Sequence, residues 1–146
     1  MLAGQLALIA AALFTGAAIY INAAEQPARL DLGDQALFIE WRSAYKRGFA
    51  MQAPLALVGS VLGLSAWWQT NDWSWLVGAI VFVANWPYTL FAVGPTSRQI
   101  KAINSAGAGS KSRMLIERWG RLHAVRSVLG FAATLVFLWA SMTSMR

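Results

Sequence analysis

Residues 48–97, GFAMQAPLALVGSVLGLSAWWQTNDWSWLVGAIVFVANWPYTLFAVGPTS, contain a single charged side chain, Asp72. Asp72 divides this stretch into two uncharged runs, residues 48–71 and 73–97. Each run is at least as long as the roughly 20 residues that cross a bilayer as a helix. A helix satisfies its backbone hydrogen bonds within the segment, as the interior of a bilayer demands. The stretch therefore predicts a hairpin of two transmembrane helices.

Two further uncharged runs, residues 1–24 and 127–145, flank this hairpin. The first lacks the basic amino-terminal region of a signal peptide, so we expect it to be retained as a span. The sequence thus predicts an all-α integral membrane protein, a four-helix antiparallel transmembrane bundle. We expect one domain, residues 1–146, with spans at about 2–24, 49–70, 73–94 and 122–143.

The composition agrees with a membrane protein, because 58% of the residues are hydrophobic and only 12% are charged, against about 25% charged in soluble domains. The chain has no cysteine and one histidine. Disulfides, thiolate metal sites and multi-histidine metal sites within one chain are therefore excluded, and no metal site is predicted.

The distribution of the basic residues predicts the orientation. The net charge is +6, and the basic side chains gather between spans one and two and between spans three and four, whereas the turn at residues 69–74 has none. The positive-inside rule places both long loops in the cytoplasm and both termini outside it, in what we expect to be a bacterial inner membrane. The predicted partners of these charges are membrane lipids and not nucleic acid.

Helices two and four are expected to extend beyond the membrane into the cytoplasm. An apolar stripe at four-residue spacing, Leu37, Trp41, Tyr45 and Phe49, precedes span two, and Leu115, Trp119 and Leu122 precede span four. Asp31 or Asp34 is the expected cap of helix two.

Glycines on span two indicate close helix packing. Gly59 and Gly63 form a GxxxG pattern, which favours close approach of another helix. That helix belongs either to the same chain or to a second copy, so an oligomer through these two glycines is one reading of the pattern.

Polar side chains interrupt all four spans at a similar depth, counted at about 1.5 Å per residue. They are Asn22, Glu25, Gln52, Asn85, Tyr88, His123 and Arg126. Such groups are costly in lipid and normally face the bundle interior or a cavity. Pro87 lies beside them and is expected to break the helix. Such breaks occur in membrane helices where the freed backbone groups are buried in protein or line a cavity. We expect one polar cavity near the cytoplasmic side.

The chemistry of these residues suggests roles. His123 or Glu25 is the candidate base, and Arg126 would hold an anionic oxygen. Candidate substrate-binding residues are Asn22, Gln52, Asn85, Trp86, Tyr88 and Trp119. Alternatives are a structural Glu25–Arg126 ion pair, an arginine that reaches lipid phosphates, a histidine at the lipid boundary, and tryptophans that only pack.

Several motifs resemble the anthrone-oxygenase-like family of small membrane proteins. They are the stretches at 25–30 (EQPARL), 45–48 (YKRG), 51–52 (MQ), 85–89 (NWPYT), 95–96 (PT) and 118–126 (RWGRLHAVR). The resemblance implies four membrane helices and, for some members, oxygenation of an anthrone to an anthraquinone without metal or flavin. The chain departs from many relatives at Gln26, where they carry histidine, and at Ser97, where they carry asparagine.

Three hypotheses for function follow. The first is a cofactor-independent oxygenase that acts on an anthrone-like or other lipophilic phenol. The second is a binding or transport protein for a lipophilic ligand such as a quinone, or haem with His123 as axial ligand. The third is a structural membrane scaffold.

Overall fold

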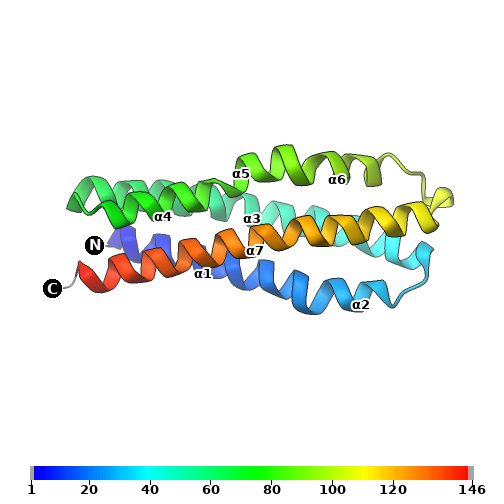
Figure 1. Ribbon diagram of the computed structural model, residues 1–146, viewed down its shortest axis with the longest axis horizontal. Coiled ribbons are helices and arrows are strands. Elements are labelled where there is room, and N and C mark those ends of the chain that lie inside the picture. Colours follow the sequence, from blue (N-terminus) through cyan, green and yellow to red (C-terminus); the bar gives the residue numbers. More distant parts are fainter. Residues whose placement is uncertain (1, 145–146) are drawn as a thin grey trace.

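Four helical rods run side by side along the long axis of the computed structural model, which describes residues 2–144 (Figure 1). The first rod comprises α1 (Leu2–Tyr20), the π-helical turn η1 (Ile21–Glu25) and α2 (Gln26–Leu30). The second rod is α3 (Asp34–Thr70). Both are long and apolar enough to cross a membrane.

The third rod comprises α4 (Trp73–Val83), α5 (Asn85–Tyr88), the π-helical turn η2 (Thr89–Val93) and α6 (Gly94–Lys101). A 3-10 turn, η3 (Ser105–Gly107), leads to the fourth rod, α7 (Ser110–Thr143). These two rods also meet the length and apolarity of a membrane span. The predicted all-α, four-helix membrane fold is therefore confirmed.

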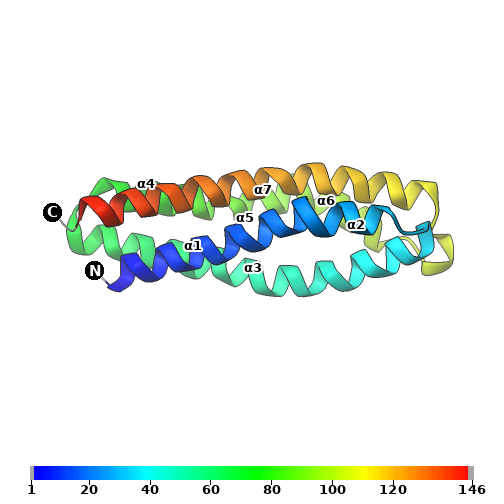
Figure 2. The same cartoon turned by 90° about the horizontal axis from the view of Figure 1, so that it is seen from below.

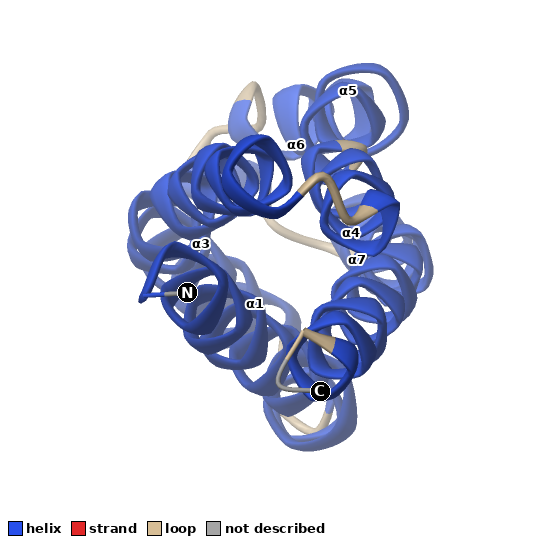
Figure 3. Cartoon of the chain, turned by 90° about the vertical axis from the view of Figure 1, so that its left-hand side faces the viewer, coloured by secondary structure: helices blue, strands red, loops and turns tan. Residues whose placement is uncertain are grey.

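The rods alternate in direction, and seen end-on they surround a common axis (Figure 3). Both chain ends and the turn between α3 and α4 lie together at one end, here called the termini end (Figures 1 and 2). The connections after α2 and after α6 lie at the other end, here called the basic end. Residue 145, the last of the fourth uncharged run, lies outside the described part of the chain.

The extension of helices beyond the membrane follows from their length. With 37 residues, α3 is about 55 Å long, well beyond the roughly 30 Å hydrocarbon core. The expected side-chain cap of this helix is wrong. Gly33 occupies the cap position with no side-chain hydrogen bond, and Asp34 instead accepts a hydrogen bond from Arg113 of α7. This contact joins the second and fourth rods at the basic end.

Two apolar cores fill the bundle, one near each end. The core toward the termini end contains Phe14, Trp75, Phe82 and Phe137 together with eight alanines from Ala7 to Ala140. The core toward the basic end contains four residues of the predicted apolar stripes, Leu37, Trp41, Leu115 and Trp119. Its other members are Phe38, Val93, Ile100 and Ile116. The stripes therefore pack against one another and extend the bundle past the lipid-facing region.

The two glycines of the GxxxG pattern pack inside the chain. A Cβ atom on Gly59 would clash with the ring of Phe82 and lie 3.0 Å from Ala10, and one on Gly63 would lie 2.8 Å from Phe137. Both glycines are buried. The pattern thus serves intrachain packing, and an oligomer would need another surface than the one suggested by the sequence.

The third rod is broken where Pro87 predicts a break. Because proline has no N–H, the carbonyl of Val83 loses its usual donor, and α4 ends at Val83. The rod resumes at Asn85 with a visible offset (Figure 1). The π-helical turns η1 and η2 occur on the first and third rods, where the core near the basic end begins. Such turns are frequent at functional sites.

Candidate functional site

A layer of buried polar side chains separates the two apolar cores. Its members are Gln52, Asn85, His123 and Arg126, with exposed fractions between 1% and 7%. They come from the second, third and fourth rods, and Asn22 of η1 joins them from the first. The four rods therefore meet in one polar layer, as the common depth of these residues in the sequence predicts.

Asn22 fixes the orientation of His123. The amide nitrogen of Asn22 donates to the carbonyl of Gly120 at 2.9 Å, and a carbonyl can only accept. The amide oxygen of Asn22 must then face Nδ1 of His123, 2.8 Å away. It also accepts a hydrogen bond from the hydroxyl of Ser127 at 2.8 Å. Nδ1 is thus the donor, and within residues 2–144 Nε2 has no hydrogen-bond partner.

Arg126 is a buried cation without a counter-ion. Within the described residues, no carboxylate lies within 4.0 Å of its guanidinium, and its Nε has no hydrogen-bond partner. The guanidinium carbon lies 5.4 Å from the centre of the Phe14 ring, a cation–π contact. A buried charge is normally paired, so this arginine is available to an anionic ligand.

Two narrow cavities meet at Arg126. The inner cavity has an empty volume of about 310 Å³, and the lateral cavity has about 290 Å³. Phe49 and Arg126 border both. The inner cavity is also bordered by Glu25, Gln52, Trp119 and His123. These volumes include space open to the surroundings, and the enclosed part of each cavity, about 20 Å³, has room for about one water molecule.

The lateral cavity lies between α3 and the broken part of the third rod. Asn85, Trp86, Thr89 and Leu90 border it from the third rod. Leu90 is 52% exposed on the apolar surface of the bundle. The lateral cavity therefore has a lipid-facing side, while its inner wall carries the guanidinium of Arg126.

Several buried polar atoms around the cavities lack hydrogen-bond partners in the described part of the chain. They are both amide atoms of Gln52, Oδ1 of Asn85 and Nε1 of Trp119. Buried polar atoms in folded proteins are nearly always hydrogen-bonded to protein or water. Their concentration at the cavity walls is typical of a site that receives polar groups of a ligand.

The structural ion pair between Glu25 and Arg126, which the sequence left open as an alternative, does not form among the described residues. Glu25 pairs with Arg29, one helical turn further along its own rod. Arg29 also contacts Glu40 of α3, with its Nε 2.8 Å from the carboxylate, and donates to the side-chain oxygen of Gln26 at 3.3 Å. The four-residue spacing of Glu25 and Arg29 is the sequence signal that could have identified this pair.

Two of the predicted substrate-binding residues also hold helices together. The hydroxyl of Tyr88 donates to the carbonyl of Leu122 at 2.8 Å, which ties the third rod to α7, and Tyr88 borders neither cavity. The indole N–H of Trp86 donates to the carbonyl of Ala53 at 3.2 Å, while Trp86 also borders the lateral cavity.

Gln26 lies outside both cavities. Its amide nitrogen donates to the carbonyl of Ile116 at 3.0 Å, between α2 and α7. Gln26 therefore serves the packing of α2 on α7 near the basic end. Ser97 is likewise buried outside the cavities and donates to the carbonyl of Val93.

A family model described as anthrone oxygenase matches residues 41–136, about two thirds of the chain. The match includes every candidate site residue from Gln52 to Arg126 and excludes Asn22 and Glu25. No curated protein and no solved structure matches the chain.

Proposed function

This chain belongs to the anthrone oxygenase family, and we propose that it oxygenates an anthrone or a related lipophilic phenol without a bound cofactor. One observation carries the proposal. The unpaired guanidinium of Arg126 borders both cavities beside His123, whose Nε2 has no partner within residues 2–144. An acid–base group and a fixed positive charge are the two functions that deprotonation of an anthrone requires.

In the first step, His123 acts as the base. An anthrone has a CH₂ group between two aromatic rings, opposite a ketone. Nε2 of His123 removes one proton from this carbon, while Asn22 holds Nδ1 in place. The negative charge of the resulting anion spreads onto the former ketone oxygen, where Arg126 stabilises it. We prefer His123 to Glu25 as the base because the Glu25 carboxylate is already paired with Arg29.

In the second step, the electron-rich carbon reacts with dioxygen. A C–O bond forms, and the proton held by His123 passes to the peroxide oxygen to give a hydroperoxide. Loss of water then breaks the O–O bond and the remaining C–H bond and leaves a new C=O group. One oxygen atom of O₂ enters the quinone and the other leaves as water. The substrate carbon supplies all four electrons, so no external reductant is consumed.

The lateral cavity supports access from lipid. Leu90 and Phe49 are 52% and 40% exposed and form its outer border. A lipophilic phenol dissolved in the bilayer would pass these apolar side chains before it meets the guanidinium of Arg126. Its polar oxygen would then face the unpartnered amide of Gln52 in the inner cavity.

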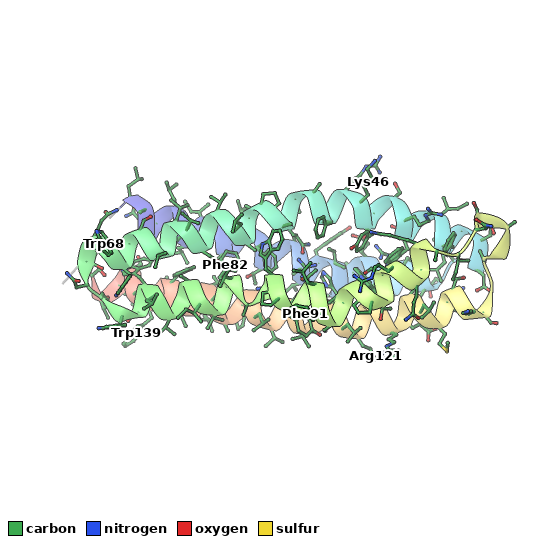
Figure 4. All side chains as sticks on the ribbon, turned by 90° about the horizontal axis from the view of Figure 1, so that it is seen from above. Lys46, Trp68, Phe82, Phe91, Arg121 and Trp139 are labelled. Atoms are coloured by element: carbon green, nitrogen blue, oxygen red, sulfur yellow. The ribbon has the colours of Figure 1, made fainter. Side chains whose placement is uncertain are left out.

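The test uses the purified protein in lipid nanodiscs with anthrone and ¹⁸O₂. Wild type should accelerate anthraquinone formation over empty nanodiscs, with one ¹⁸O in each quinone. His123→Gln and Arg126→Gln should each lower the rate at least about 100-fold. Arg121→Gln is the matched control, because Arg121 is exposed at the surface of α7 and borders neither cavity (Figure 4). Equal rates for wild type and empty nanodiscs would overturn the proposal.

Binding or transport of a quinone or haem is the second candidate, because the same cavities and the unpartnered Nε2 would serve it. It predicts ligand binding without turnover. A Soret absorbance band that His123→Gln abolishes would support haem, and a quinone found by mass spectrometry of the purified protein would support quinone binding.

A further inference from the structure

A basic groove lies between α3 and α6, outside the cavities of the polar layer. Its lining consists of Trp41, Arg42, Tyr45, Lys46, Phe49 and Lys101, and its empty volume is about 660 Å³. Three of these six side chains are cationic and none is acidic. Within the described residues, none of the three cations forms a salt bridge. Like charges gathered in one groove repel each other, so an anion between them would be stabilising.

Part of this charge has local explanations. Lys101 is in the last turn of α6, where a cation interacts favourably with the helix dipole, and its ammonium lies 4.2 Å from the centre of the Tyr45 ring. Arg42 lies 5.5 Å from the Phe38 ring. Neither contact neutralises a charge, and neither accounts for Lys46.

A buried donor provides an independent indication of a ligand. Trp41 lines the groove and is fully buried, yet its indole N–H has no hydrogen-bond acceptor among residues 2–144. Tyr45 stacks on Trp41 at 4.8 Å and on Phe49 at 6.2 Å, so these rings cover one another in part, and Phe49 stays 40% exposed. The groove therefore combines positive charges with an unsatisfied N–H buried in its wall. This combination favours a small oxyanion over an aromatic ligand.

The groove lies at the edge of the lipid-facing surface. Phe49 and Met51 are 40% and 51% exposed on α3, and Lys46 lies within one helical turn of Phe49, toward the basic end. On the third rod the exposed apolar residues end at Phe91, which is 81% exposed. Figure 4 shows Phe91 at the surface and Lys46 projecting outward from α3. This is the level of phospholipid headgroups, whose phosphates attract Lys and Arg side chains.

We propose that the basic groove is a specific site for the phosphate of an anionic phospholipid headgroup in the leaflet that meets the basic end. Arg42, Lys46 and Lys101 supply the charge, and the unsatisfied N–H of Trp41 in the groove wall becomes a donor to the phosphate when the wall adjusts around it. The site shares Tyr45 and Phe49 with the inner cavity, so a bound headgroup would order one wall of that cavity.

The test compares protein in nanodiscs of phosphatidylcholine with and without phosphatidylglycerol, with retained lipid read by native mass spectrometry. We expect wild type to retain phosphatidylglycerol preferentially. The triple variant Arg42→Gln, Lys46→Gln, Lys101→Gln should lose about tenfold or more of that preference. The control triple variant Lys111→Gln, Arg118→Gln, Arg121→Gln removes the same charge from exposed positions of α7 and should keep the preference.

Trp41→Phe distinguishes a specific phosphate site from general electrostatic attraction of anionic lipid to the basic end. It removes one N–H and no charge, and we expect a loss of about three- to tenfold in preference; Trp68→Phe, at an indole that is 79% exposed, should have no effect. This variant also keeps the test decisive if the triple variant fails to fold. Equal losses in the two triple variants, or no preference in wild type, would overturn the proposal. Displacement of phosphatidylglycerol by millimolar inorganic phosphate would assign the site to free phosphate and overturn the lipid assignment.

Discussion

Two buried arginines in this bundle differ in whether carboxylates lie beside them. Arg29 is 3% exposed and contacts the carboxylates of Glu25 and Glu40. Arg126 is 7% exposed and has no carboxylate within 4.0 Å among the described residues. Removal of one member of a buried ion pair leaves the other uncompensated, whereas removal of a lone buried charge leaves nothing unpaired. The two arginines should therefore respond oppositely to the same substitution.

Arg126→Met should leave the protein as stable as wild type or more stable, by up to about 1–4 kcal/mol, because a buried charge is replaced by an apolar side chain. Arg29→Met should destabilise it by about 3 kcal/mol, toward the lower limit of the usual range because both of its carboxylate partners are partly exposed. Thermal unfolding in detergent, followed by tryptophan fluorescence, measures both. A clear loss of stability in Arg126→Met would mean that Arg126 is held by a structural partner.

Depth along the spans predicts the polar layer, but depth alone does not predict which of its charged residues pair. Depth along each span places Glu25, His123 and Arg126 near one level, and the structure brings all three to the inner cavity. Depth carries no information on rotation about the helix axis. Glu25 pairs with Arg29 and not with Arg126, because Arg29 lies one helical turn from Glu25 on the same rod. The roles of these residues in catalysis remain predictions.

The packing of α2 on α7 depends on a missing side chain at Gly120. A Cβ atom there would lie 2.6 Å from the amide nitrogen of Gln26 and 2.9 Å from its Cδ. Gln26 cannot easily move away, because it donates to Ile116 and accepts from Arg29. The carbonyl of Gly120 also accepts the hydrogen bond of Asn22. A shift of α2 away from α7 would therefore disturb the residue that orients His123.

Gly120→Ala should destabilise the protein by about 1–3 kcal/mol, the usual cost of overpacking. Adding Gln26→Ala should recover part of the loss, because it removes the atoms that clash, and the two changes should be non-additive. Gly16→Ala is the matched control: a Cβ atom on Gly16 of α1 would have no neighbour within 4 Å, so stability should hold or rise slightly. An unchanged melting temperature in Gly120→Ala would show that the Gln26 side chain moves aside at little energetic cost.

The sequence predicts where each rod begins and ends better than it predicts which face of the rod points into the bundle. Uncharged length identifies the four spans, and the apolar stripes identify the core near the basic end. The π-helical turns η1 and η2 give no comparable signal in the sequence. Each π-helical turn accommodates an extra residue, which rotates the following side chains by about 100° relative to a regular helix of 3.6 residues per turn. Asn22 and Glu25 lie within η1, where regular periodicity no longer gives the facing direction.

Along the bundle, one polar layer lies between two apolar cores. The core near the termini end is built largely of alanines and phenylalanines and lies beneath the lipid-facing surface. The core near the basic end extends past that surface and is tied by Arg113 to Asp34. Polar groups that lipid would disfavour thus lie between two apolar regions, and Trp119 belongs both to the core near the basic end and to the wall of the inner cavity.

The orientation of the bundle in the membrane can be tested directly because the chain has no cysteine. Ten of its basic residues lie in or next to the two long connections at the basic end, so we expect this end to face the cytoplasm. Gln69→Cys reports on the termini end and Ser105→Cys on the basic end, and both positions are exposed. Gln69 is preferable to Asp72, because Asp72 caps α4 by accepting from the backbone of Ser74 at 2.9 Å.

In intact cells, a membrane-impermeant thiol reagent should label Gln69→Cys, whereas Ser105→Cys should react only after the membrane is opened. The cysteine-free wild type gives the background, and labelling after solubilisation confirms that both thiols are reactive. The reverse pattern would invert the bundle and place the basic groove in the outer leaflet. Labelling of both positions in intact cells would contradict the spanning arrangement itself, because the two sites lie at opposite ends of rods about 50 Å long.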